Sequence, residues 1–320
     1  RRPRFRRAAV VVAGPGVTVE DNRARLHRSE PVTPEAVLRV AAAAAHNDAR
    51  LASDTIERLQ EAELEVPARW SDELRTLFVD LLKAGHAAIP VIETMDQLGL
   101  FVPFIAEWAP TRSRPQRNAY HRFTVDRHLW ETAAEAAQFQ GEVDRPDLLL
   151  VGALLHDIGK GYPGDHTEVG MELITNIAER MNFSPSDVAI LVKMCEHHLL
   201  LPDVATRRDL DDDDTIRSVA DAAGSVRVLY LLRALTEADS VATGPSAWST
   251  WKAGLVRDLA DRAAYVLEGG DVGELPRNFP SEDQREQMRR GTTGINADGE
   301  TLTVMVMDRP GVFSRVAGAV

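Results

Sequence analysis

The feature of this sequence that most restricts its fold is an apolar run that ends in two ionisable residues. Leu148 to Leu155 is hydrophobic or small at every position, and His156 and Asp157 follow it directly. A helix that is apolar on all sides belongs in a protein interior. Ionisable groups beside it are costly to bury unless they are paired or hold a metal. The pair is therefore either a hydrogen-bonded structural pair or a pair of ligands, and the local sequence leaves both interpretations open.

Composition argues against several other classes of protein. The 320 residues exceed one average domain. No apolar run approaches the roughly 20 residues that cross a bilayer, so no membrane segment is expected. The net charge of -12 argues against nonspecific nucleic-acid binding, which requires a basic surface. With Cys195 as the single cysteine, an internal disulfide is impossible and a cytoplasmic location is expected.

The N-terminal third predicts short strands followed by helices. Val10 to Val19 predicts one or two strands, interrupted at Gly14-Pro15-Gly16. A helix then begins at Pro34 with Thr33 as its N-cap, and helical patterns continue to about Leu98. This region has no Gly-Ser followed by an Asp-x-Asp pair, which a nucleotidyl-transferring site needs to hold a metal-bound triphosphate. We therefore expect any such catalytic core to lie upstream of this chain.

Further along the chain, separate segments offer histidines on predicted helices or in loops. A helix that begins near Thr124 carries His128, and a loop places His166 at the start of the next helix. In the helix that begins at Ser184-Pro185, the apolar face includes His198 but not His197. Spacing therefore favours His198 as the inward-pointing residue, although each histidine alone is more often a structural or surface residue.

Asp239 lies on the leucine stripe of a helix that Ser225 begins. A carboxylate on such a face requires a positive partner. Arg227 and Arg233 are close in sequence, so an ion pair with arginine is an alternative to a ligand role. Trp248 and Trp251 are expected to anchor the packing of the following helix.

Imidazoles and carboxylates together suit a divalent cation. They bind Mn, Fe or Zn, and Mg where carboxylate and water dominate. One Asp between histidines can bridge two metals about 3.5–4 Å apart, a pair that holds a phosphoryl group and lowers the pKa of a bound water. Lys160 could then stabilise the charge that grows on phosphate oxygens.

The ordered set resembles the HD metal-dependent phosphohydrolase superfamily through His128, His156-Asp157 and Asp239. The chain also resembles the bifunctional uridylyltransferase/uridylyl-removing enzymes of nitrogen regulation. The segments that support this closer resemblance are Thr124–His128, Leu154–Lys160, Gly164–His166, His198 with Arg207–Asp209, Ala238-Asp239 and Trp248–Lys252. Pro34 to Arg39 resembles the end of that family's transferase region, and Asp308 to Ser314 resembles the start of an ACT domain, a small-molecule sensor fold.

The resemblance implies a mainly α fold. A helical HD-domain bundle would be preceded by a helical arm from the end of the nucleotidyltransferase region and followed by the first βα unit of a truncated ACT domain. The expected divisions are the arm at 1–115, the HD domain at 116–268, a linker at 269–299 and the start of the ACT domain at 300–320.

The resemblance also implies a site and a reaction. The metal ligands would be His128, His156, Asp157 and Asp239, with His166 and His198 completing a second metal site or contacting phosphate. Lys160, Asp157 and His166 would act in catalysis with Mn or Mg, Fe or Zn being alternatives. The reaction would hydrolyse the phosphodiester that links UMP, or AMP, to a tyrosine of the PII signal protein. Glutamine would control it through the ACT region.

Two other functions stay open at this point. One is an HD hydrolase that acts on a free nucleotide. The other is a non-catalytic module that relays the glutamine signal.

Overall fold

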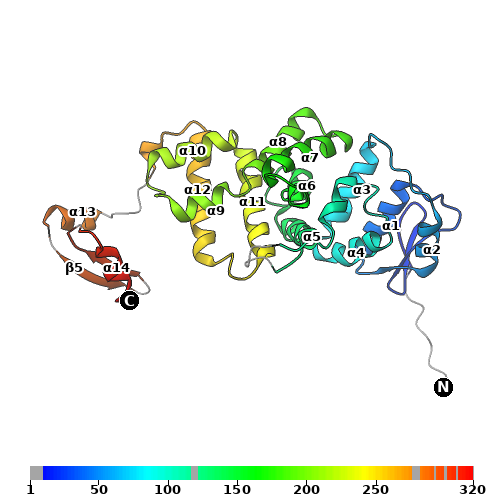
Figure 1. Ribbon diagram of the computed structural model, residues 1–320, viewed down its shortest axis with the longest axis horizontal. Helices are drawn as coiled ribbons and strands as arrows, with labels where there is room; N and C mark the ends of the chain where they lie inside the picture. The colour runs from blue at the N-terminus through cyan, green and yellow to red at the C-terminus, as the bar shows by residue number, and fades with distance from the viewer. Residues whose placement is uncertain are drawn as a thin grey trace, which may run out of the picture.

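The computed structural model describes residues 10–116, 122–275, 282–291, 293–298, 301–307 and 309–319. Helices make up most of these residues, so the prediction of a mainly α fold is confirmed (Figure 1). None of the helices in the described ranges has the length and apolar composition needed to span a bilayer.

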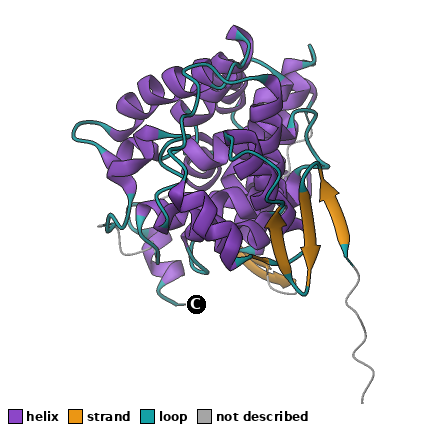
Figure 2. Ribbon diagram, turned by 90° about the vertical axis from the view of Figure 1, so that its right-hand side faces the viewer, coloured by secondary structure: helices purple, strands orange, loops and turns teal. Residues whose placement is uncertain are grey.

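A small sheet lies near the N-terminus, in front of the helices in Figure 2. Strands β1 (Val11–Gly14), β2 (Val17–Glu20) and β3 (Arg23–Leu26) form an antiparallel meander, and β4 (Arg50–Leu51) pairs in parallel with β3. The predicted break at Gly14-Pro15-Gly16 is the turn between the first two strands. The sequence did not predict β3 and β4, because these short strands contain arginines and no apolar run.

The helices of this region are α1 (Pro34–His46), α2 (Ser53–Glu61), α3 (Asp72–Lys83) and α4 (Ile89–Gln97). Helices α1 and α2 pack against the sheet, and α3 and α4 pack against α1. The hydroxyl of Thr33 accepts from the amide of Ala36 at 3.2 Å, which confirms the predicted N-cap of α1. The small side chains of Ala41 to Ala45 are all buried and let α1 pack closely against α3. Short 3-10 segments continue the chain at Gly85–Ala88 and Ala106–Thr111.

The middle of the molecule is a helical bundle built around α6 (Pro146–Leu155), which lies among other helices in Figure 1. Every residue from Leu148 to Leu155 is buried, as the apolar run predicts. The surrounding helices are α5 (Val125–Ala136), α7 (His166–Arg180), α8 (Pro185–Glu196), α9 (Leu200–Arg207), α10 (Asp213–Ala223), α11 (Val226–Thr243) and α12 (Thr250–Leu267). Further 3-10 turns span Ala137–Phe139, Ile158–Gly161 and Val272–Glu274.

The buried side chains form two hydrophobic cores that share α11. The larger core runs from the N-terminal sheet to α8 and includes Leu235 of α11. It is continuous across the predicted domain boundary at 115/116, where Trp108 stacks on Trp130 with ring centroids 5.6 Å apart. The smaller core lies among α9, α10 and α12 and includes Leu232 of α11. The division of the chain at 115/116, 268/269 and 299/300 stays a prediction.

The C-terminal residues differ in part from the expectation. Helix α13 (Glu282–Arg289) and strand β5 (Gly294–Asp298) lie in the segment predicted as a linker, 269–299. Strand β5 is polar, and its pairing partner, β6 (Thr301–Met305), lies beyond the predicted linker, which is why the sequence did not indicate it. The predicted strand and helix correspond to β6 and α14 (Val312–Ala317). Asp308, the first residue of the segment that resembles the start of an ACT domain, lies outside the described residues.

Candidate metal centre

The end of α6 positions the two residues on which the site is built. His156 is the C-cap of α6, and Asp157 turns the chain into the following 3-10 segment. Their exposed fractions are only 1% and 2%. The Nδ1 of His156 donates to the carbonyl of Ala153 at 2.8 Å, which leaves Nε2 directed into the bundle.

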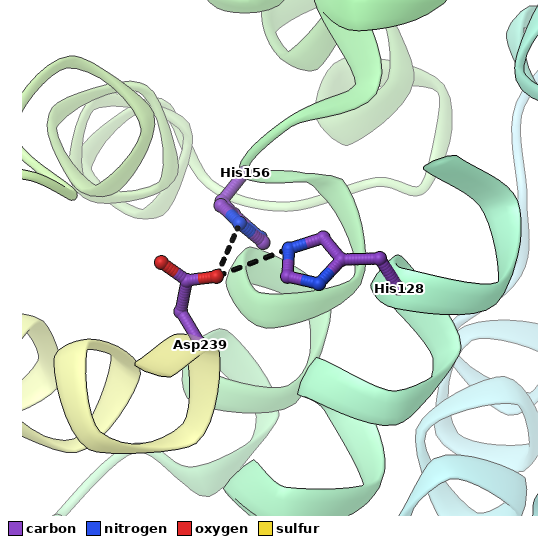
Figure 3. Close-up of side chains that lie close together, drawn as sticks. All are labelled: His128, His156 and Asp239. Carbon is purple, nitrogen blue, oxygen red and sulfur yellow. Dashed lines mark ion pairs between the residues drawn. The ribbon is translucent and has the colours of Figure 1, made fainter. Parts of the chain in front are cut away.

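A first cluster joins His128 of α5, His156 and Asp239 of α11 (Figure 3). The Oδ1 of Asp239 lies 3.0 Å from Nε2 of His128 and 3.5 Å from Nε2 of His156. The possible ligand atoms all lie within 4.8 Å of one another. Three helix segments that are distant in sequence therefore bring two imidazoles and one carboxylate to a single point.

The arginine partners considered for Asp239 are engaged elsewhere. Arg227 pairs with Asp144 at 2.6 Å, and Arg233 pairs with Glu142 at 3.2 Å. The partners of Asp239 are thus the histidines of the cluster.

A second cluster joins Asp157, His166 and His198. The Oδ1 of Asp157 lies 3.9 Å from Nε2 of His166 and 3.8 Å from Nε2 of His198. The Nδ1 of His198 donates to the carbonyl of Cys195 at 2.6 Å, so that its Nε2 faces the cluster. Helix α8 ends at Glu196, so His198 reaches the cluster from the turn that follows and not from the helix itself. His197 instead lies 3.7 Å from the carboxylate of Glu196.

Asp157 belongs to both clusters because its two oxygens face different ways. Its Oδ2 lies 3.4 Å from Nε2 of His156 and 3.9 Å from Nε2 of His128, whereas Oδ1 faces the second cluster. This is the placement that a carboxylate bridging two cations requires. The structure thus brings together all six predicted ligands, whose role as ligands remains a prediction.

The electrostatics of the clusters favour a cation. Burial lowers the pKa of His156, but the carboxylates of Asp157 and Asp239 outweigh this effect and raise that pKa to about 10. Burial raises the pKa of each carboxyl, but the neighbouring imidazoles, and Lys160 beside Asp157, hold both pKa values well below their usual range. Burial lowers the pKa of His198. The negative field that retains a proton on His156 would equally attract a divalent cation.

The buried polar atoms also fit a cation. The Nε2 of His156 and the Oδ1 of Asp157 are buried and have no hydrogen-bond partner within the described residues. Buried polar atoms without a partner are uncommon and costly. A divalent ion in each cluster would satisfy both atoms, and the donor set of imidazole and carboxylate fits Mn, Fe or Zn.

Both clusters open into a cleft of about 1340 Å³. Lys160 lies at this cleft, where its Nζ pairs with Asp157 and donates to Oε1 of Gln116 at 3.2 Å. His166 also faces the cleft, with 39% of its side chain exposed, against 4% for His198. The sequence did not indicate Gln116 as a neighbour of Lys160, because no pattern relates residues so far apart.

The expectation that Trp251 anchors the packing of α12 is wrong. Its exposed fraction is 67%, and it lines the cleft. The physical reason is its place in the first turn of α12, whose buried face begins only at Val256. Trp248, before the helix, is partly buried and donates from its indole to Glu237 at 3.3 Å.

Comparison with known proteins agrees with this geometry. The family model described as "HD domain" matches residues 125–223. The chain contains an HD domain. That HD domain includes His128, His156-Asp157, His166 and His198, while Asp239 lies beyond the matched residues on α11.

Similarity extends well past the HD domain. A bifunctional uridylyltransferase/uridylyl-removing enzyme of Streptomyces coelicolor is 43% identical over 300 residues, covering 92% of this chain and 35% of the relative. The enzyme of the same name from Mycobacterium tuberculosis is 41% identical over 292 residues, covering 89% of this chain and 36% of the relative. The chain is thus homologous to these enzymes and spans about a third of their length. The HD domain and the names of the relatives support a hydrolase.

Proposed function

We propose that this chain is the nucleotidyl-removing hydrolase part of a bifunctional uridylyltransferase/uridylyl-removing enzyme. Its substrate would be the PII signal protein carrying UMP, or AMP, on a tyrosine through a phosphodiester. The observation that supports this proposal most directly is the position of Asp157 between two His/Asp clusters at one cleft. The C-terminal strand and helix would belong to an ACT region through which glutamine controls the reaction.

The residues of the two clusters would each bind one of two divalent ions. When bound, divalent ions supply Lewis-acid polarisation of phosphoryl oxygens and a water of lowered pKa. His128, His156 and Asp239 would hold one ion, and His166 and His198 the other, with Asp157 shared. Lys160 would hold an oxygen of the phosphodiester from the cleft side, since its ammonium already lies beside Asp157.

The size and openness of the cleft support a protein substrate over a free nucleotide. Its volume of about 1340 Å³ exceeds the roughly 300–1,000 Å³ of pockets that enclose small molecules. A nucleotidyl group together with a stretch of polypeptide would fit this space better than a nucleotide alone.

The test is hydrolysis of nucleotidylated PII by this chain with Mn²⁺ or Mg²⁺. Release of UMP or AMP is expected, with loss on chelation and at least a hundredfold loss of kcat/KM in Asp157→Asn, because one substitution affects both clusters. His197→Gln is the matched control and should retain activity, since His197 faces Glu196. Undiminished activity in Asp157→Asn would overturn the proposal. Hydrolysis of free nucleotides with modified PII untouched would favour the free-nucleotide hydrolase instead.

A further inference from the structure

Two exposed apolar side chains stand out at the cleft. Within the described residues from 122 to 275, the exposed large hydrophobic side chains are Leu199 at 47% and Trp251 at 67%. Both line the cleft into which the two clusters open. Exposed apolar surface rimmed by polar residues at a cleft is typical of a ligand-binding groove, so the position of the indole is consistent with a ligand.

One continuous wall connects Trp251 to the candidate metal centre. Helix α11 contributes Asp239, Ser240 and Thr243 to the cleft, a short loop follows, and Trp251 lies in the first turn of α12. The hydroxyl of Ser249 caps that turn by accepting from the amide of Lys252 at 3.2 Å. The indole is therefore held on an ordered helix start, not on a free loop.

The cleft carries charges of both signs: Lys160, Arg207 and Lys252 line it, and so do Asp157, Asp203 and Asp239. Arg207 pairs with Asp203 at 3.4 Å, and Lys160 pairs with Asp157. Lys252, one residue from the indole, keeps its ammonium on the carbonyl of Ala247 at 3.0 Å. A phosphate at the clusters with an aromatic ring at Trp251 would match this arrangement of charge and apolar surface.

We propose that Trp251, with Leu199 beside the same cleft, is the subsite for the nucleobase of the nucleotidyl group, which stacks on the indole. This inference rests on the proposed function, since it supplies the nucleotide whose phosphate lies at the clusters. Stacking is tolerant of base identity because every base has a π-face. The subsite therefore accepts uracil or adenine, and Trp251 is a positioning residue that does not touch the reacting atoms.

The test compares UMP with ribose 5-phosphate, which has the phosphate and sugar but no base. Calorimetric titration of the Mn²⁺-loaded chain should give about tenfold tighter binding of UMP, equivalent to about 1.4 kcal/mol. Trp251→Ala should abolish this difference by weakening UMP alone, and Trp251→Phe should restore most of it. On nucleotidylated PII, Trp251→Ala should raise KM about tenfold and leave kcat nearly unchanged.

Trp248→Phe is the matched control, because Trp248 is a neighbouring tryptophan that packs against Glu237. It should retain the preference for UMP. Equal binding of UMP and ribose 5-phosphate to the wild-type chain, or equal weakening of both by Trp251→Ala, would overturn the subsite. So would a raised KM for modified PII with UMP binding unchanged, which would assign the indole to the polypeptide. Failure of the proposed function gives a different result: no hydrolysis of modified PII in any variant.

Discussion

The Nε2 of His128 and the Oδ1 of Asp239 lie 3.0 Å apart, although one residue belongs to α5 and the other to α11. The contact closes the first cluster across the bundle. It depends on the packing of α5 against α11, which are in extensive contact along their lengths. The cluster is therefore a property of the tertiary fold and not of any single segment.

Removal of one imidazole from the second cluster should change the metal content. His198→Ala is expected to lower the bound Mn²⁺ or Zn²⁺ from two ions to one per chain, because His198 faces Asp157 in that cluster only. Elemental analysis after dialysis measures this. His197→Ala is the control, and equal metal content in the two variants would contradict the division into two clusters.

Metal binding should release a proton and strengthen as the pH rises. In the metal-free chain the pKa of His156 is raised to about 10 from 6.5, so this imidazole is protonated at pH 7. A metal must displace that proton, which gives about a tenfold gain in affinity per pH unit for one proton. Titration calorimetry in buffers of different ionisation enthalpy counts the protons released; a count of zero at pH 7 would contradict the assignment.

The same pKa has a consequence for the stability of the metal-free chain. A raised pKa means that the imidazolium of His156 stabilises the fold fully below 6.5 and that this contribution is lost as the pH rises towards about 10. His156→Gln should lack this dependence. Urea unfolding at pH 6 and at pH 9, with chelator present, would show it as a smaller difference between the two pH values in the variant.

The ion pair between Glu107 and Arg180 should make a pH-dependent contribution of the opposite sign. The two terminal guanidinium nitrogens of Arg180 donate to the two carboxylate oxygens of Glu107 at 2.9 and 2.6 Å. This pair joins the 3-10 segment at Ala106–Thr111 to α7. Burial raises the pKa of Glu107, but Arg180 outweighs it and the pKa is lowered. Glu107→Gln should cost about 1–2 kcal/mol at pH 7. Because the pKa is lowered, this cost should shrink as the pH falls below the ordinary value of 4.5 and Glu107 becomes protonated; an equal cost at pH 7 and in acid would be inconsistent with the ion pair.

Any side chain at Gly159 should destabilise the fold. A Cβ there would lie 2.0 Å from the carbonyl oxygen of His166 and 2.7 Å from the amide nitrogen of Gly170, both on the backbone of α7. Gly159→Ala should therefore displace the start of α7, cost about 2–3 kcal/mol and weaken the second ion. Gly254→Ala is the control: a Cβ there meets nothing within 4 Å, so a gain of up to about 1 kcal/mol is expected. Thermal unfolding with and without metal compares them.

Local patterns in the sequence predicted what depends on local physics. The run from Leu148 to Leu155 predicted the buried helix, and Thr33-Pro34 predicted the start of α1. The apolar spacing that selected His198 over His197 agrees with the burial of His198 in the second cluster. The sequence did not predict strand β5, because its residues are polar and its strand conformation depends on pairing with β6. Trp251 was misplaced because hydrophobicity alone does not distinguish a packed indole from one that faces a cleft.

Helix α11 belongs to both hydrophobic cores, with Leu235 in the larger one and Leu232 in the smaller one. The same helix holds Asp239, whereas His128 and His156 come from helices of the larger core alone. The position of Asp239 relative to the two imidazoles therefore depends on how α11 packs in both cores, and a substitution among the buried residues of α9, α10 or α12 can alter the first cluster without touching it.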